Sequence, residues 1–227
     1  MNQFERVVTR NTANAGTSVL ATNKVIRNTY ALLAMTLLFS AACAGVAMAL
    51  DMPSPGLLVF LVGSLGLSYL TTRYSHSATG LIFIFAFTGF MGAMLGPILN
   101  IYLRGFSNGG ELIMMALGGT GALFLGLSGY ALTSRKNFSF MRGMLFTGVW
   151  VAFLAGIGAL VFHLPGLSLA VSVMFVVLMS GMILYQTGEL VNGGETNYIL
   201  ATITLYTSLF NLFISLLRLL GVFGGRN

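Results

Sequence analysis

The sequence predicts an all-α, polytopic membrane protein built as a bundle of seven transmembrane helices. Hydrophobic residues make up 56% of the 227 residues, charged residues only 7%, and the mean hydropathy is +0.90, whereas a soluble domain has roughly 25% charged residues. The charges lie in short polar intervals between apolar runs, each near the ~20 residues that a helix needs to cross a bilayer. The short alternating segments typical of a membrane β-barrel do not occur in the sequence.

The chain begins with a polar segment, residues 1–29, that lacks the apolar core of a cleavable signal peptide. Its mixture of Thr, Asn, Ala and scattered charge follows no helical or strand period. We therefore expect a disordered cytosolic tail with a short interfacial turn near Lys24 to Asn28, and a first span that directs membrane insertion by itself.

The spans that follow form one predicted transmembrane domain, residues 30–222, and leave a short external C-terminus at 223–227. Pro55 suits the first turn of the second span, because its missing N–H would have no intrahelical partner there. The third span should kink or end around Gly96 and Pro97, and the GxxxG pattern of Gly92 and Gly96 favours close helix packing. The expected spans are residues 30–50, 55–72, 79–103, 112–133, 143–164, 168–189 and 197–222.

The basic residues predict the orientation. With seven spans, most of the eleven Lys and Arg residues fall on one side, which the positive-inside rule places in the cytoplasm. The N-terminus is then cytoplasmic and the C-terminus external, most simply in a bacterial inner membrane, with an organelle membrane as the alternative. The predicted inner side carries Arg6, Arg10, Lys24, Arg27, Arg73, Arg135, Lys136 and Arg142, and the outer side carries Arg104, Arg218 and Arg226.

Several function classes find no support in the residues. The net charge of +6 comes from residues that flank spans and form no continuous patch, which argues against nucleic-acid binding. Cys43, His76 and His163 are too scattered for a metal site. No nucleophile has a base at matching depth, so we predict no enzyme, and "GGTG" lacks the Lys-Ser or Lys-Thr of a phosphate-binding loop, so no cofactor is expected.

The last span carries a polar stripe, which we call the seam. Its members are spaced by four, three, four and three residues, so they share one helical face, which Asn197 and Ala201 extend: Thr204, Ser208, Asn211, Ser215 and Arg218. A polar face is costly against lipid and should point into the bundle or toward water. Interhelical hydrogen bonding, with Arg218 reaching the outer interface, and a polar pathway through the bundle are both open interpretations.

The sixth span ends in "YQTGEL", where Gln186 and Glu189 lie about one turn apart on the same face. Glu189 is either an ordinary interfacial carboxylate or a titratable group at the mouth of a cavity. Glu195 follows the "NGG" turn and is expected to be more exposed.

These motifs resemble those of the Bax inhibitor-1 (transmembrane Bax inhibitor motif) family, and most closely its bacterial YccA branch. The likeness runs in order from about residue 24 to residue 221. The matching pieces are "RNTY", "PSPGL", "FAFTGF", "GPILN", "ALGGT", "RKNFSF", "ILYQTGELVNGGETNYI" and "LYTSLFNLFISLLRLLG".

The resemblance implies a bundle in which six helices surround a central C-terminal helix. Members of the calcium-leak type carry one aspartate in each of the last two spans, proposed to share a proton and gate ion passage. At the dyad-equivalent positions this chain has Gln186 and Ser208 instead, and neither side chain ionises near neutral pH. The family's basic clamp residue is matched by Arg73, whose acidic partners on that side would be Glu189 and Glu195.

Three functions stay open at this stage. The YccA branch implies a non-enzymatic modulator and substrate of the membrane-anchored AAA protease FtsH, which could grip a loose N-terminal tail. The wider family implies a calcium or other cation leak, here without the di-aspartyl pH switch. A membrane scaffold with neither role is the third possibility. The partners expected are the lipid bilayer, an AAA protease and Ca²⁺ or another cation.

Overall fold

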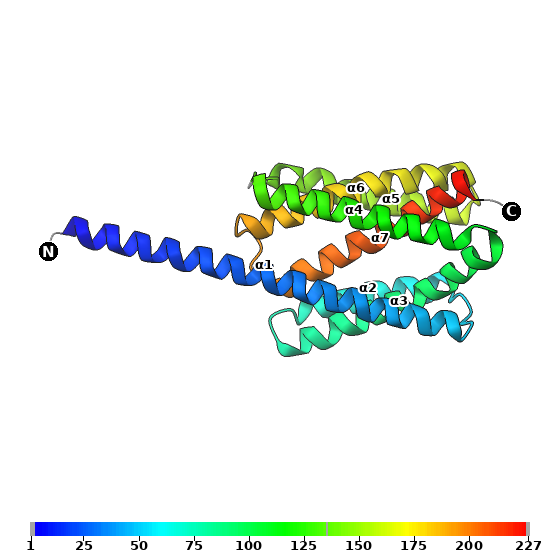
Figure 1. Ribbon diagram of the computed structural model, residues 1–227, viewed down its shortest axis with the longest axis horizontal. Helices are drawn as coiled ribbons and strands as arrows, with labels where there is room; N and C mark the ends of the chain where they lie inside the picture. Colours follow the sequence, from blue (N-terminus) through cyan, green and yellow to red (C-terminus); the bar gives the residue numbers. More distant parts are fainter. Residues whose placement is uncertain (1–2, 135, 226–227) are drawn as a thin grey trace.

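The computed structural model describes residues 3–134 and 136–225, with side chains from residue 23 onward. Within this part of the chain the secondary structure is entirely helical (Figure 1). The elements are α1 (Gln3–Ala49), α2 (Leu57–Arg73), α3 (Ala78–Gly105), α4 (Gly109–Ser134), the 3-10 turn η1 (Ser139–Met141), α5 (Arg142–Val161), α6 (Pro165–Val191) and α7 (Tyr198–Gly224).

Six of the described helices are long and apolar enough to cross a membrane, which confirms the predicted helical membrane bundle. The exception is α2, whose 17 residues extend about 25 Å at ~1.5 Å per residue. This length falls just short of the ~30 Å hydrocarbon core. The prediction of seven membrane crossings therefore stays a prediction.

Two proline expectations differ from the structure in detail. Pro55 lies just before α2, which begins at Leu57, and Pro165 is the proline that occupies a first helical turn, in α6. Pro97 does not end the third helix, because α3 continues through it to Gly105. Pro97 is buried, and packing can hold a helix together across the one backbone hydrogen bond that a proline removes.

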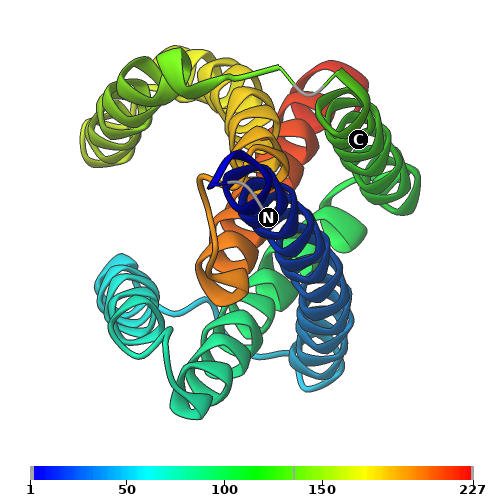
Figure 2. The same cartoon turned by 90° about the vertical axis from the view of Figure 1, so that its left-hand side faces the viewer.

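The C-terminal helix α7 is central, as Figure 2 shows in the end-on view. It contacts α1, α2, α3, α4 and α6. In the most apolar 18-residue stretch of α7, 61% is buried inside the bundle, whereas the corresponding stretches of the other candidate spans are 17–39% buried. Its Leu205, Leu212 and Leu217 are almost fully enclosed, so this helix holds the core that the others surround.

The structure differs from the expected ring of six helices in the position of α5. The helix α5 contacts α6 and η1 but not α7, so it lies outside the first layer. Small residues account for this pairing: a Cβ at Gly148 of α5 would lie 2.6 Å from Leu178 Cδ2, and a Cβ at Gly181 of α6 would lie 2.7 Å from Leu145 Cδ2. The glycines thus receive leucines of the opposite helix, and α5 is held to α6.

The helices α1 and α3 cross closely at the predicted GxxxG pattern. A Cβ at Gly92 would lie 2.2 Å from the backbone oxygen of Ser40, and a Cβ at Gly96 would lie 2.6 Å from Ala47 Cβ. Since such distances are too short for any side chain, the two backbones approach as they do only where glycine is present.

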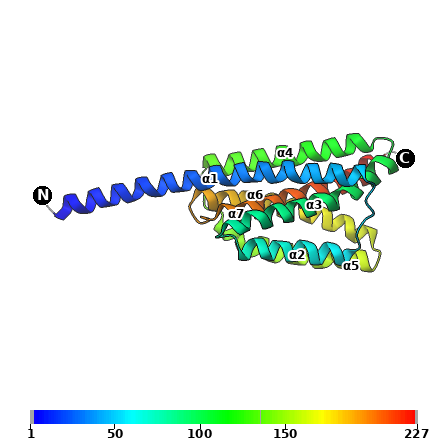
Figure 3. The same cartoon turned by 90° about the horizontal axis from the view of Figure 1, so that it is seen from below.

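At the N-terminus, α1 continues as a helix well beyond the bundle (Figures 1 and 3). The sequence predicts a disordered tail over residues 1–29, whereas the backbone of residues 3–29 is helical. The chain has no proline before Pro53 to interrupt the helix that the first span begins. We call residues 3–22 the N-terminal extension; their side chains, including Arg6 and Arg10, lie outside the described residues.

Candidate functional site

The seam of α7 lies mostly inside the bundle. Ser208 and Ser215 are buried, Thr204 and Asn211 are half-buried, and Arg218 is exposed near the end of the helix. The stripe therefore points toward protein over most of its length, as its polarity requires.

The hydrogen bonds of the seam stay within α7. The Thr204 hydroxyl donates to the Leu200 backbone oxygen at 2.9 Å, the Ser208 hydroxyl to the Thr204 oxygen at 2.8 Å, and the Asn211 amide to the Thr207 oxygen at 2.8 Å. These groups are thus satisfied by the turn below them rather than by neighbouring helices. They do not act as interhelical links in this conformation.

The two dyad-equivalent positions are both buried. Gln186 is 6% exposed and Ser208 is 2% exposed, on the contacting helices α6 and α7. Because Ser208 donates to its own helix, no hydrogen bond joins the two side chains in this structure. The positions keep the low-dielectric surroundings in which a carboxylate pair would titrate near neutrality, but neither residue supplies a charge.

The predicted electrostatic gate is not assembled. Arg73 is exposed at the end of α2, and no ion pair joins it to Glu189 or Glu195 among the described residues. Glu195 Oε1 instead accepts the Asn197 backbone N–H at 2.7 Å. The Glu189 carboxylate packs against the following turn, since a Cβ at Gly194 would lie 2.6 Å from its Oε2.

A buried tyrosine joins three helices that the seam leaves unconnected. The Tyr206 and Ser40 hydroxyls are 2.6 Å apart, and the Tyr206 hydroxyl also donates to the Thr88 backbone oxygen at 3.3 Å. Tyr206 is only 1% exposed. Sequence reasoning did not single out Tyr206, although a tyrosine deep in a span needs a hydrogen-bond partner, and that need is the signal that could have found it.

A second polar junction centres on Thr187 of α6, which is fully buried. Its Oγ1 lies 3.3 Å from the Tyr30 hydroxyl of α1 and 3.3 Å from Ser128 Oγ of α4. Thr187 directly follows the dyad-equivalent Gln186, so the junction ties α1 and α4 to α6 at that level. Its members come from three distant segments, and no sequence spacing links them.

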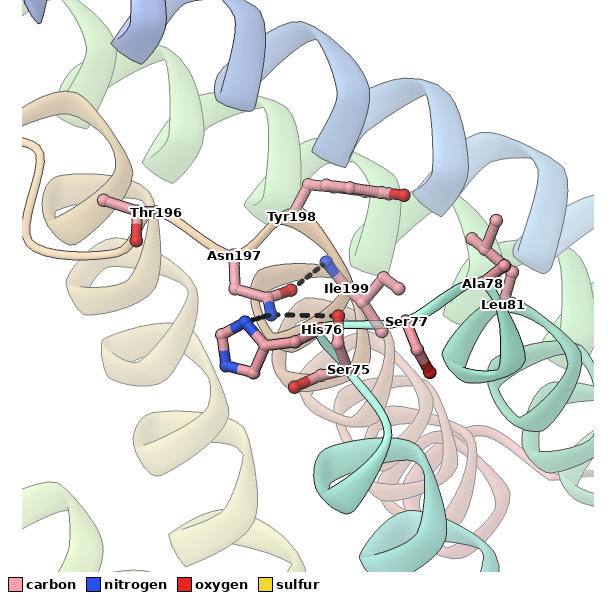
Figure 4. A pocket seen from close by; sticks show the side chains of 9 residues that line it. All are labelled: Ser75, His76, Ser77, Ala78, Leu81, Thr196, Asn197, Tyr198 and Ile199. Carbon is pink, nitrogen blue, oxygen red and sulfur yellow. Dashed lines mark hydrogen bonds between the residues drawn. The ribbon is translucent and has the colours of Figure 1, made fainter.

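A cavity of about 450 Å³ lies where the loop between α2 and α3 meets the start of α7 (Figure 4). Asn197 builds this junction. Its Oδ1 accepts the N–H groups of Ile199 and Leu200 at 2.9 and 3.2 Å and so caps α7, while its Nδ2 donates to the Ser75 backbone oxygen at 3.0 Å and lies 3.4 Å from His76 Nδ1. One side chain therefore caps the central helix and fixes it to the neighbouring loop.

The described residues contain no group of three or more His, Cys, Asp or Glu side chains that could hold a metal ion. Among these residues an ion pair joins Asp51 and Arg104 at the opposite end of the bundle. The geometry is thus that of a packed helical core with polar junctions between helices, and with a cavity at the end from which α1 projects.

Comparison with known proteins finds relatives that match nearly the whole chain. The family model described as "Inhibitor of apoptosis-promoting Bax1" matches residues 22–225. The chain is 50% identical over 205 residues to the "Modulator of FtsH protease YccA" of Escherichia coli, covering 90% of this chain and 93% of that protein.

Two further relatives show how widely the family extends. An uncharacterised protein of Pseudomonas aeruginosa is 51% identical over 201 residues, which cover 88% of this chain and 90% of that protein. "Protein lifeguard 4" of the mouse is 34% identical over 170 residues, which cover 74% of this chain and 69% of that protein.

Proposed function

Because this chain belongs to the Bax inhibitor-1 family, we propose that it is a multi-pass inner-membrane protein that modulates a membrane-anchored AAA protease of the FtsH type, without catalytic activity of its own. The observation that carries the proposal is the 50% identity, over nearly the whole of both chains, to a relative named for modulating FtsH. An Escherichia coli relative with the same identity is named an inner membrane protein.

The N-terminal extension supports a direct role as a substrate of that protease. The helix α1 leaves the bundle in both side views (Figures 1 and 3), so its first turns lie away from the packed helices. A pulling ATPase needs an end that resists extraction little, and a helix without tertiary packing is marginal in water. The cytoplasmic position of this end is part of the proposal and follows from the positive-inside rule.

Deletion of residues 2–20 tests the proposal. The shortened chain should still insert, because the span Asn23–Ala49 is intact, but it should lose FtsH-dependent turnover in a pulse-chase experiment. The control replaces residues 2–20 by an unrelated soluble sequence of equal length, which should restore turnover if only a loose end is needed. Unchanged degradation of the shortened chain would refute the extension as the point of engagement.

The modulating role has its own readout. Overproduction of the full chain should lengthen the half-life of another membrane substrate of FtsH, because the two compete for one protease. The shortened chain should compete less. If neither form changes that half-life while the full chain itself is degraded, the protein is a substrate and not a modulator.

A cation leak is the second candidate, favoured by the burial of Gln186 and Ser208 on the contacting helices α6 and α7. The pathway would follow the seam of α7. Hard cations prefer several oxygen ligands, carboxylates among them, and the nearest acid along α6 is Glu189. A Glu189→Gln variant that leaves Ca²⁺ flux into proteoliposomes unchanged would argue against a carboxylate at that position serving the leak.

A further inference from the structure

One strip of the central helix α7 is not fully covered by the rest of the bundle. Its residues are half-exposed, and Arg218 at its far end is exposed. The helices α2 and α6 both contact α7 but not each other, and α7 crosses between the group of α1, α2 and α3 and the group of α4, α5 and α6 (Figures 1 and 2). We call this the open strip, and it consists of Leu200, Thr204, Thr207, Asn211, Ile214 and Arg218.

The open strip has the spacing of a helix-packing seam. Its residues follow one another at intervals of four and three, which is the pattern of a helix that another helix contacts along its length. Helices in membranes mostly pack in this way, at crossing angles near +20°. The strip therefore has the register to receive one further helix that crosses the membrane beside α7.

Asn211 carries an unused hydrogen-bonding group in this strip. Its Nδ2 donates to the Thr207 backbone oxygen at 2.8 Å, whereas its Oδ1 accepts no hydrogen bond from the described residues. This oxygen is not one of the enclosed side-chain atoms that lack a partner, so a group outside the bundle can reach it. An unpaired amide oxygen facing hydrocarbon is costly, and a donor on a neighbouring helix removes that cost.

The depth of Asn211 indicates which kind of group can reach it. Asn211 is the middle residue of α7 (Tyr198–Gly224), so it lies about 20 Å from either end of the helix at ~1.5 Å per residue. The hydrocarbon core is ~30 Å thick, and its centre is therefore about 15 Å from either layer of phospholipid headgroups. A side chain of another membrane-spanning helix reaches this depth, whereas a headgroup does not.

Arg218 adds a positive charge two turns further along the same strip. It is exposed and forms no ion pair or hydrogen bond within the part of the chain that the structure describes. A carboxylate at the same level of a neighbouring helix complements this charge. A second copy of the chain is a poor match, because copies inserted in the same direction and paired symmetrically through this strip bring two Arg218 side chains together.

We propose that the open strip docks a membrane-spanning helix of another protein, which carries a side-chain amide or hydroxyl at its middle and a carboxylate two turns nearer the Arg218 end. The amide or hydroxyl donates to Asn211 Oδ1, and the carboxylate pairs with Arg218. The proposal rests on the geometry of α7 and not on a link to any protease.

Energy transfer between the labelled full-length protein and synthetic membrane-spanning peptides in phosphatidylcholine vesicles tests the proposal. The probe is a leucine-rich helix with asparagine at its middle and glutamate seven residues beyond it. The reference peptide has leucine at both positions, and both are used at dilutions at which the peptide alone does not associate. The native protein should bind the probe about tenfold more tightly than the reference.

Variants of the protein test the two contacts separately. Asn211→Leu should weaken binding of the probe about fivefold, and it should keep the fold by circular dichroism, since the Asn211 side chain bonds only within its own helix. Arg218→Gln should weaken binding about threefold. The matched control is Arg104→Gln, which removes an exposed arginine at the same end of the bundle and should bind the probe like the native chain.

An exchange of charges keeps the test decisive even where Asn211→Leu alters the fold. Arg218→Glu should bind a probe with lysine in place of glutamate more tightly than the original probe, which reverses the preference of the native chain. The proposal is overturned if the native protein binds probe and reference equally, or if Arg218→Glu leaves the preference unchanged.

Two other occupants of the strip have their own signatures. Energy transfer between differently labelled copies of the full-length protein that disappears in Asn211→Leu would assign the strip to a second copy. Phosphatidylglycerol that displaces the probe from the native protein, but not from Arg218→Gln, would assign it to anionic lipid. Either result would overturn the proposal, whereas probe binding that survives both comparisons supports it.

Discussion

Tyr206 carries a hydroxyl into the centre of the bundle, where its hydrogen bonds decide how three helices meet. Ser40 of α1 and the Thr88 backbone oxygen of α3 are its partners, and Phe87 packs edge-on against its ring at 5.8 Å. By contrast, the hydroxyls of the seam bond within α7. The polar groups that specify the packing are thus different residues from those that form the stripe.

Tyr206→Phe should lower the free energy of unfolding by about 1 kcal/mol, because it leaves the buried Ser40 hydroxyl without its partner. The measurement is unfolding in mixed micelles with increasing sodium dodecyl sulfate. Tyr69→Phe is the matched control, since Tyr69 is 67% exposed and should tolerate the same change. Equal stability of both variants would contradict the assigned role of Tyr206.

Asp51 and Arg104 link the loop after α1 to the end of α3 at the opposite end of the molecule. The hydrogen bond from Arg104 holds the pKa of the Asp51 carboxyl below its usual value of 3.8, and Asn100 Nδ2 donates to the same oxygen at 3.1 Å. A depressed pKa means that the contribution to stability is present above pH 3.8 and is lost as the pH falls through the lower, folded-state value.

The unfolding temperature of the native protein should therefore fall more between pH 5 and pH 3 than that of Asp51→Asn. The difference should be small, because both side chains are exposed to solvent. Thermal unfolding followed by intrinsic fluorescence, at low and high salt, provides the comparison. Parallel pH profiles for the two proteins would show that the pair contributes nothing.

At the scale of elements, glycines decide which helices touch. Several glycines in the spans face open space, and a Cβ at Gly118 of α4 would meet nothing within 4 Å. A Cβ at Gly92 would meet the backbone of α1. The sequence identifies both as small residues in a span, but only the structure separates the glycine that permits a crossing from the one that faces outward.

Gly92→Ala should destabilise the protein by about 1–3 kcal/mol, since the added methyl group forces α1 and α3 apart. Gly118→Ala should be neutral or slightly stabilising, because alanine favours helix and the site is open. The measurement is the fraction of each variant that stays folded in detergent after mild heating, under the same conditions for both. A Gly92→Ala protein as stable as Gly118→Ala would mean that the crossing can relax without cost.

At the scale of the whole molecule, the sequence predicts what depends on sums over a span. Hydropathy over about 20 residues identifies the helices. The polar face of the last span predicts that it points into the bundle or toward water, and Ser208 and Ser215 of this face are buried. The junctions depend on which helices meet, so Tyr30, Ser128 and Thr187 could not be brought together from spacing alone. The position of α5 outside the central layer likewise depends on which helices meet, so spacing along the sequence could not predict it.

Conduction is a question for the whole bundle, because a leak needs a continuous path that spans the membrane. By their sequence motifs, Gln186 and Ser208 match the positions where family members of the calcium-leak type carry aspartates, and this match stays a prediction. Both side chains are buried, and burial raises the pKa of one carboxyl in a close pair. Restoring both acids by Gln186→Asp/Ser208→Asp supplies a shared proton that is lost between pH 6 and pH 8, and with it a cation-binding charge.

Calcium-indicator flux into proteoliposomes should consequently rise from pH 6 to pH 8 for this double variant and show no such change for the native protein. Gln186→Asn/Ser208→Asn is the control, because asparagine has the volume of aspartate and no titratable proton. A pH-dependent leak confined to the acidic pair would mean that the bundle is a pore scaffold without its switch, which favours the protease-linked role for the native chain. Conduction by the native protein would instead show that an uncharged pair suffices, and the leak would then become the first function to pursue.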